Sequence, residues 1–195
     1  MPPMPESPLP KVKIAPPGEP LTDGVVTLRL WQAVDAPAIA AACQDPEIPR
    51  WTRVPSPYAE SDARAWLAHD WECWASAEGA HFAAVAAASD KVLGSVGIVD
   101  FEWDDHRAEI GYWVAPWARR CGVARRAVCL LCTWAFAELE IVRLEILPDV
   151  RNLASIGVAR ACGFTDEGVR RKYMVIKDEL CDCVSFSLLK GEQSV

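Results

Sequence analysis

The feature that most restricts the fold of this chain is the pattern of one amphipathic helix that lies between two strand patterns. Between residues 122 and 139 the apolar side chains recur with the period of a helix that buries one face. Residues 107–114 before it and 143–147 after it have the apolar composition of strands. A strand, a helix and a second strand in succession form a crossover unit, so we predict a mixed α/β fold.

The remaining patterns extend this unit into one sheet with helices. Strands are predicted at residues 25–31, 82–88, 92–101, 169–176 and 181–189, and further helices at about 36–44, 61–77 and 155–161. This gives an α+β arrangement of about seven strands flanked by about four helices. Asp35 is expected to cap the first helix. The four prolines among residues 45–58 predict an irregular loop that carries Trp51.

The composition is that of a folded protein with a single domain. Of the 195 residues, 51% are hydrophobic and 24% are charged. The longest apolar run, residues 127–137, is well short of the roughly 18 residues that a membrane span needs. A net charge of −7 matches a phosphate backbone poorly. We therefore expect neither nucleic acid nor a membrane as a partner.

The two ends of the chain differ from its centre. Eight of the fifteen prolines fall within the first twenty residues, as in extended or disordered segments. We predict a Pro-rich disordered tail over residues 1–22, one domain over 23–190 and a short C-terminal tail over 191–195. No basic and then apolar signal pattern opens the chain, so we expect a cytoplasmic protein.

The eight cysteines could indicate a disulfide framework, but half of them stand in apolar or helical surroundings. Reduced thiols in the core fit this distribution better. A zinc site would have to be assembled from separate cysteine pairs and distant histidines, so no metal is expected. The three histidines are isolated in the sequence, and none is assigned a role.

Residues 115–126 carry the chemistry that is easiest to interpret. A strand ends there, a loop turns and a long helix begins, and the segment contains four arginines and no acidic residue. The first amides of a helix lack internal partners and lie at the positive end of its dipole, which favours a phosphate or pyrophosphate group. The alternative is an ordinary turn with solvated arginines.

Together with residues 144–164, this segment resembles the GNAT superfamily of acyl-CoA-dependent acetyltransferases, in its RimJ/RimL-like branch of ribosomal-protein N-terminal acetyltransferases. The similarity covers residues 25–190 and includes an upstream segment at residues 45–52. The matching motifs are Glu109 with Gly111 and Tyr112, Arg119 with Gly122 and Ala124, and Asn152 with Ser155, Gly163 and Phe164. No single motif is specific, but their order and spacing together are.

One residue departs from the family pattern. Many members have glycine where this chain has Arg120, followed by a basic residue where it has Cys121. A side chain at this position could obstruct the approach of backbone amides to the pyrophosphate. Alternatively, Arg120 contacts the phosphates itself.

The resemblance implies a GNAT fold and acetyl transfer from the cosubstrate acetyl-CoA to an amine. Backbone N–H groups near Trp113 and Val114 would polarise the thioester carbonyl, which requires the strand to separate locally from its neighbour. Asn152 would hold the pantetheine amides. The implied acetyl-CoA-binding residues are Trp113, Val114, Arg119, Arg120, Cys121, Gly122, Val123, Ala124, Asn152 and Ser155.

The same resemblance assigns catalytic roles. Glu109 would accept the proton of the attacking amine, directly or through water, unless it faces solvent or pairs with Arg107. Ser155, or else Tyr173, would donate a proton to the departing thiolate. The alternative for Ser155 is that its hydroxyl caps the helix at residues 155–161.

Trp51, Trp103 and Tyr112 are expected to line the acceptor side. The acceptor would be a protein N-terminus or a small-molecule amine, and a homodimer is left open. The rival interpretation is a non-catalytic acyl-CoA-binding protein that keeps the fold but has a degenerate pyrophosphate loop at Arg120.

Overall fold

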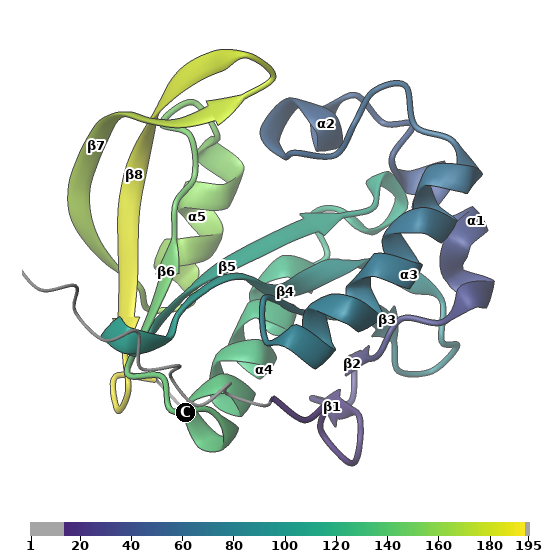
Figure 1. Cartoon of the computed structure of the whole chain (residues 1–195), viewed down its shortest axis with the longest axis horizontal. Coiled ribbons are helices and arrows are strands. Elements are labelled where there is room, and N and C mark those ends of the chain that lie inside the picture. Colours follow the sequence, from purple (N-terminus) through teal and green to yellow (C-terminus); the bar gives the residue numbers. More distant parts are fainter. Residues whose placement is uncertain (1–13, 194–195) are drawn as a thin grey trace, which may run out of the picture.

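One mixed sheet organises residues 14–193, the part of the chain that this computed structural model describes (Figure 1). The spatial order of its strands is β1-β2-β3-β4-β5-β6-β8-β7. All neighbours pair antiparallel except β5 and β6, which are parallel and joined by the helix α4. The predicted mixed α/β class and its crossover unit are confirmed.

The described residues form eight strands and five α-helices, against the seven and four predicted. The strands are β1 (Leu21–Thr22), β2 (Val26–Arg29), β3 (Ala80–Ala86), β4 (Val92–Glu102), β5 (Arg107–Val114), β6 (Arg143–Ile146), β7 (Thr165–Ile176) and β8 (Glu179–Leu189). The α-helices are α1 (Ala36–Ala42), α2 (Glu47–Trp51), α3 (Glu60–Ser76), α4 (Val123–Glu138) and α5 (Leu153–Ala161). Among residues 14–193 no helix is both long and apolar enough to span a bilayer.

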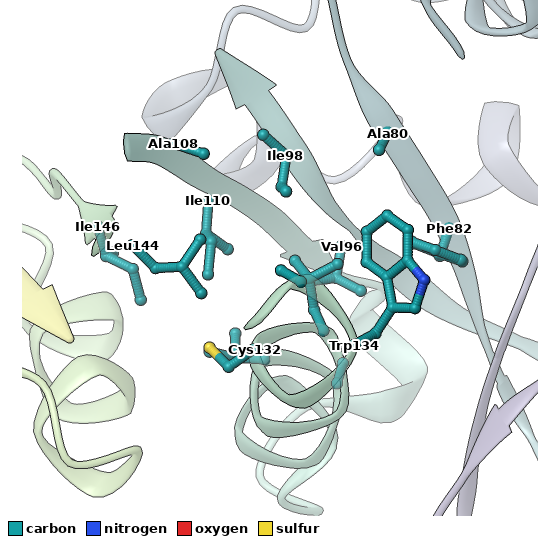
Figure 2. Packing of buried hydrophobic residues seen from close by; sticks show 14 of the residues in the cluster. Ala80, Phe82, Val96, Ile98, Ala108, Ile110, Cys132, Trp134, Leu144 and Ile146 are labelled. Carbon is teal, nitrogen blue, oxygen red and sulfur yellow. The ribbon is translucent and has the colours of Figure 1, made fainter. Parts of the chain in front are cut away.

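Apolar side chains pack on both faces of the sheet. On one face α4 supplies Leu131 and Trp134, and the ring of Trp134 lies 5.2 Å from that of Phe82 on β3 (Figure 2). On the other face α1 and α3 bury Ile39 and Leu67 in a second cluster. The strands at the centre of the sheet are therefore covered on both sides, which holds their ends in fixed positions.

The sheet opens between its two parallel strands. β5 pairs with β6 only from Arg107 to Glu109, opposite Arg143 to Glu145. β6 ends at Ile146, whereas β5 continues to Val114. The last residues of β5 consequently have β4 on one side and no strand on the other. The local separation that the family resemblance implied is present.

Two local predictions near the N-terminus are wrong. Residues 47–51 form the helix α2 within the predicted loop, because Pro46 and Pro49 fall at its N-cap and first turn, where proline costs no hydrogen bond. Asp35 does not cap α1 with its side chain. Its carboxylate instead pairs with Arg29, at 2.8 Å, and accepts the backbone N–H of Gln32.

The domain border also differs from the expected position. The strand β1 adds residues 21–22 to the sheet, and Ile14 is buried in the core, so the packed part begins before residue 23. The rest of the predicted N-terminal tail, residues 1–13, and the last two residues of the chain lie outside the described residues.

Candidate active site

A cavity of about 480 Å³ lies where β5 and β6 separate. The open part of β5 forms its floor, and the segment after α2 and the start of α5 form its walls. The turn between β7 and β8 approaches the same opening, since Lys177 Nζ donates to the backbone oxygen of Val54 (Figure 1). The lining includes Trp51, Arg53, Tyr58, Trp66, His81, Glu109, Tyr112, Trp113, Asn152, Ser155 and Met174.

Glu109 is the carboxylate on the floor of this cavity. Its pKa is raised from 4.5 to about 7, mainly by burial; the charge of Arg53 opposes this rise, the charges of Asp100 and Glu145 contribute to it, and Arg170 opposes it. Among the described residues Glu109 forms no ion pair, and Arg107 pairs with other carboxylates. A carboxyl that titrates near neutral pH inside a cavity is suited to accept a proton.

Glu145 stands beside Glu109 on the neighbouring strand and is held in a different way. It is 3% exposed, and its carboxylate contacts Arg143 at 2.6 Å and Arg170 at 3.3 Å. These guanidinium groups keep the buried charge of Glu145 paired. Of the two adjacent carboxyls, Glu109 is the one that faces the cavity.

Two hydroxyl groups meet where the open part of β5 lies beside the start of α5. The Tyr112 and Ser155 hydroxyl oxygens are 2.7 Å apart, and burial raises the pKa of Tyr112 to about 12. Ser155 does not cap α5: the helix begins two residues earlier than predicted, and Asn152 Oδ1 accepts the Ser155 N–H at 3.1 Å. The capping alternative for the Ser155 hydroxyl is wrong, and the hydroxyl is available to form a pair with Tyr112.

The backbone at the end of β5 presents one amide to the gap. Ala115 N–H donates to Leu93 O on the β4 side at 2.8 Å. Because N–H directions alternate along a strand, the Val114 N–H points to the side that β6 has left and the Trp113 N–H points to β4. Of the two amides expected to polarise a carbonyl, Val114 is the one directed into the opening.

The arginine-rich loop precedes α4 as predicted, but most of its side chains have protein partners. Arg119 pairs with Asp45 at 2.8 Å, Arg125 donates to Ala161 O, and Arg126 pairs with Asp23. Arg120 is exposed, and within residues 14–193 it forms no ion pair. In this part of the chain the loop therefore has one uncommitted guanidinium group.

The backbone of this loop fits a diphosphate. Arg120 and Gly122 adopt left-handed φ angles of 60° and 74°, and nothing lies within 4 Å of where a Gly122 side chain would begin. The N–H groups of Val123 and Ala124 open α4 and have no intrahelical acceptors. Left-handed residues followed by free amides form a concave surface suited to anions.

Two predicted residues are not brought to the cavity. Trp103 donates its Nε1–H to Ala77 O at 3.1 Å and stacks on Phe101, with ring centroids 4.3 Å apart. Tyr173 is 49% exposed on β7, and its neighbour Met174 lines the cavity instead. The structure does not support acceptor binding by Trp103 or proton donation by Tyr173.

Several lining residues had no signal in the sequence. Arg53 and Trp66 line the cavity, and His81 lies in its wall with its Nδ1 2.7 Å from Asp70 Oδ1. Asp70 and His81 are on different elements, so no motif joins them. The available hint was the pair of glycines at positions 79 and 97, which lie against the ring.

The cysteines form no disulfide bridge. All eight are free thiols, and of the four expected in the core, Cys43 and Cys132 are buried whereas Cys129 and Cys162 are half-buried. In the described part of the chain no three side chains of His, Cys, Asp or Glu converge in a way that could hold a metal ion.

Comparison with known proteins identifies the family. A family described as "Acetyltransferase (GNAT) domain" matches residues 26–165. The chain belongs to the GNAT acetyltransferase family. It is thus an acetyl-CoA-dependent N-acetyltransferase, as its motifs predicted.

Individual relatives agree with this membership. This GNAT enzyme is 29% identical to a protein of Bacillus licheniformis described as an uncharacterized N-acetyltransferase, p20, over 170 residues, 86% of this chain and 94% of p20. RimL, a ribosomal L7/L12 alpha-N-protein acetyltransferase solved with coenzyme A, has a TM-score of 0.79 at 18% identity, covering 88% of this chain and 98% of RimL. The ribosomal-protein-S5-alanine acetyltransferase of Vibrio fischeri has a TM-score of 0.77 at 22% identity, covering 91% of this chain and 100% of its own. These two structures show the shared fold.

Proposed function

We propose that this GNAT enzyme acetylates the α-amine of a protein N-terminus. The observation that carries the proposal is the Glu109 carboxyl in the cavity, whose pKa is about 7. The α-ammonium group of a peptide has a pKa of about 7.7–8.0, and a lysine ε-ammonium about 10.4. Proton transfer to Glu109 is therefore nearly balanced for an α-amine and strongly uphill for an alkylamine.

Glu109 removes the proton, directly or through one water, and leaves the amine nitrogen with a lone pair. When bound, acetyl-CoA supplies the thioester carbonyl that this nitrogen attacks. Val114 donates its backbone N–H to the carbonyl oxygen as negative charge develops there. The C–N bond forms, the C–S bond breaks, and the products are the N-acetyl group and the free thiol of CoA.

Tyr112 donates a proton to the departing sulfur, and the second proton that the nitrogen loses as the amide forms restores the Tyr112 hydroxyl, directly or through water. Its hydroxyl is held by Ser155 at 2.7 Å, and a pKa of about 12 keeps it protonated at neutral pH. Ser155 orients this hydroxyl in the arrangement that we propose. The sequence favoured Ser155 as the donor, and the hydrogen-bonded pair gives both residues a part in one step.

The cosubstrate would be held by the loop that opens α4. The Gly122 backbone and the amides of Val123 and Ala124 would bind the pyrophosphate, with Arg120 contacting a phosphate oxygen. Arg119 would act indirectly by fixing the loop to Asp45. Asn152 would offer its side-chain N–H, because its oxygen already caps α5.

The names of structural relatives support the choice of acceptor. RimL is described as an alpha-N-protein acetyltransferase, and the Vibrio fischeri protein as a ribosomal-protein-S5-alanine acetyltransferase. A cavity of about 480 Å³ has room for a terminal residue and the acetyl group together.

A competition within one peptide tests the proposal. The enzyme is given acetyl-CoA and a peptide with a free α-amine and one internal lysine, and the site of acetylation is read by fragment mass spectrometry. We expect acetylation of the α-amine at least tenfold faster than of the lysine. Acetylation of the lysine alone, or turnover only of small alkylamines, would refute the proposal.

A further inference from the structure

His81 lies in the cavity wall, is held there by other side chains, and has no part in the proposed chemistry. Its side chain is 18% exposed and its Nδ1 lies 2.7 Å from Oδ1 of Asp70, which is itself 5% exposed. Asp70 lies on α3 and His81 on β3. A nearly buried carboxylate thus holds an imidazole that borders the cavity.

Two glycines make room for this ring. A Cβ on Gly97 would lie 2.8 Å from His81 Cδ2, and one on Gly79 would lie 2.9 Å from Cε1. Trp66 packs against the imidazole at a ring distance of 5.7 Å. The ring is therefore fixed between α3 and the sheet, and it leans from β3 over β4.

The pairing with Asp70 determines which nitrogen is free. An ionised carboxylate only accepts hydrogen bonds, so the proton of a neutral His81 is on Nδ1. Nε2 is then an acceptor. A ligand in the cavity that meets this nitrogen must bring a hydrogen-bond donor.

The register of the sheet places this acceptor relative to Glu109. His81 is opposite Gly97, and Gly97 is opposite Gly111, so these three residues share one row and one face. Glu109 lies two residues before Gly111 on the same face of β5. Strand spacing and rise give about 8 Å between Glu109 and the ring over Gly97.

We propose that His81 selects acceptors whose first residue carries a long side chain ending in a hydrogen-bond donor. The inference rests on the proposed function: with the α-amine at Glu109, the first side chain would extend toward His81 across Val99, which packs over Gly111 and lines the cavity. Glutamine and tyrosine are long enough to donate to Nε2, whereas serine is too short. Asp70 is a positioning residue that fixes the ring and its tautomer.

The test uses peptides that differ only in the first residue, in pairs of similar shape: Gln and Met, Tyr and Phe, Ser and Ala. For the wild-type enzyme we expect kcat/KM to be at least tenfold higher for Gln than for Met and for Tyr than for Phe, mainly because KM is lower. We expect no such difference between Ser and Ala. His81→Phe should abolish the preference.

Asp70→Asn is the second variant, because His81→Phe leaves a buried carboxylate unpaired and can destabilise the fold. The introduced side-chain amide can donate to Nδ1, which moves the ring proton to Nε2, so the preference should also fall. His69→Phe is the matched control, since His69 is 63% exposed on α3, and it should behave as the wild type.

The outcomes separate the two proposals. If no peptide is acetylated on its α-amine, the proposed function and this inference both fail. If peptides are acetylated but the polar members of the long pairs are not preferred, only the role of His81 is refuted. A preference that persists in both His81→Phe and Asp70→Asn refutes it as well.

Discussion

Glu109 must be ionised to act as a base in surroundings that favour its neutral form. The cavity withdraws the carboxyl from water, and the neighbouring charges of Asp100 and Glu145 add to the effect of burial. The result is a group that exchanges its proton within the pH range in which α-amines do. Its role in catalysis and its cost to stability therefore have the same origin.

The pH dependence of turnover tests the catalytic part. Because Glu109 must be deprotonated, kcat/KM of the wild-type enzyme should fall as the pH drops below about 7. Glu109→Gln should lower kcat by roughly 100-fold or more, leave acetyl-CoA affinity nearly unchanged and remove this acidic limb. Steady-state rates from about pH 5 to 9 and calorimetric titration measure both. Near-wild-type kcat with an unshifted profile would make Glu109 structural.

The raised pKa of Glu109 also makes stability depend on pH, in the opposite direction to activity. The folded state binds the Glu109 proton more tightly than the unfolded state, so its stabilising contribution is complete below pH 4.5 and is lost as the pH rises to about 7. Glu109→Gln should therefore melt at a higher temperature than the wild type at about pH 8, and the difference should shrink at about pH 5. Scanning calorimetry at both values provides the comparison, and equal differences would contradict it.

Arg120 holds a conformation that favours glycine. Its φ of 60° costs about 1 kcal/mol for a residue with a Cβ, yet it keeps the loop on the path that glycine would follow. Arg120→Gly should therefore stabilise the fold by up to about 1 kcal/mol. It should also weaken acetyl-CoA binding about tenfold, because the exposed guanidinium is lost. Chemical denaturation and calorimetric titration measure the two effects, and tighter binding would identify the arginine as an obstruction.

At the scale of elements, the start of α5 divides two tasks between neighbouring residues. Asn152 caps the helix through its side-chain oxygen, and Ser155 is free to hold the Tyr112 hydroxyl. The geometry of a helix start thereby places a hydroxyl pair beside the open end of β5. The pair and the cap can be separated by mutation.

Asn152→Ala should cost about 1 kcal/mol of stability through loss of the cap, with a modest effect on kcat. Ser155→Ala should lower kcat severalfold or more while the melting temperature changes little, because the Tyr112 hydroxyl loses its partner. Measuring melting temperature and kcat on the same preparations distinguishes the two residues. If Ser155→Ala lowers stability and leaves kcat unchanged, the hydroxyl pair only supports the fold.

At the scale of the whole molecule, the sequence predicted what depends on local pattern. The period of α4, the strands around it and the position of Gly122 follow from spacing and turn chemistry within short windows. These features fix the sheet and the phosphate loop. They also explain why Glu109, Tyr112 and Ser155 all reach the cavity.

Contacts between distant segments could not be predicted in this way. Arg119 pairs with Asp45, 74 positions away, and His81 with Asp70 on another element. On β7, register shifts between Asp166 and Val169 and between Arg170 and Met174 change which side chains face inward, so Tyr173 points out. Only the assembled tertiary structure determines these positions.

Because pairing between β5 and β6 ends early, hydrogen–deuterium exchange at the end of β5 should report on the state of the site. In deuterated water the Val114 amide, which faces the gap, should exchange its hydrogen quickly, whereas the Trp113 amide, which faces β4, should retain it. Acetyl-CoA should slow exchange at Val114 selectively, which residue-resolved exchange by NMR can follow. Equal exchange at the two amides would mean that the strand end is closed in solution. The difference in exchange rate between these two neighbouring amides would thus report whether acetyl-CoA occupies the site.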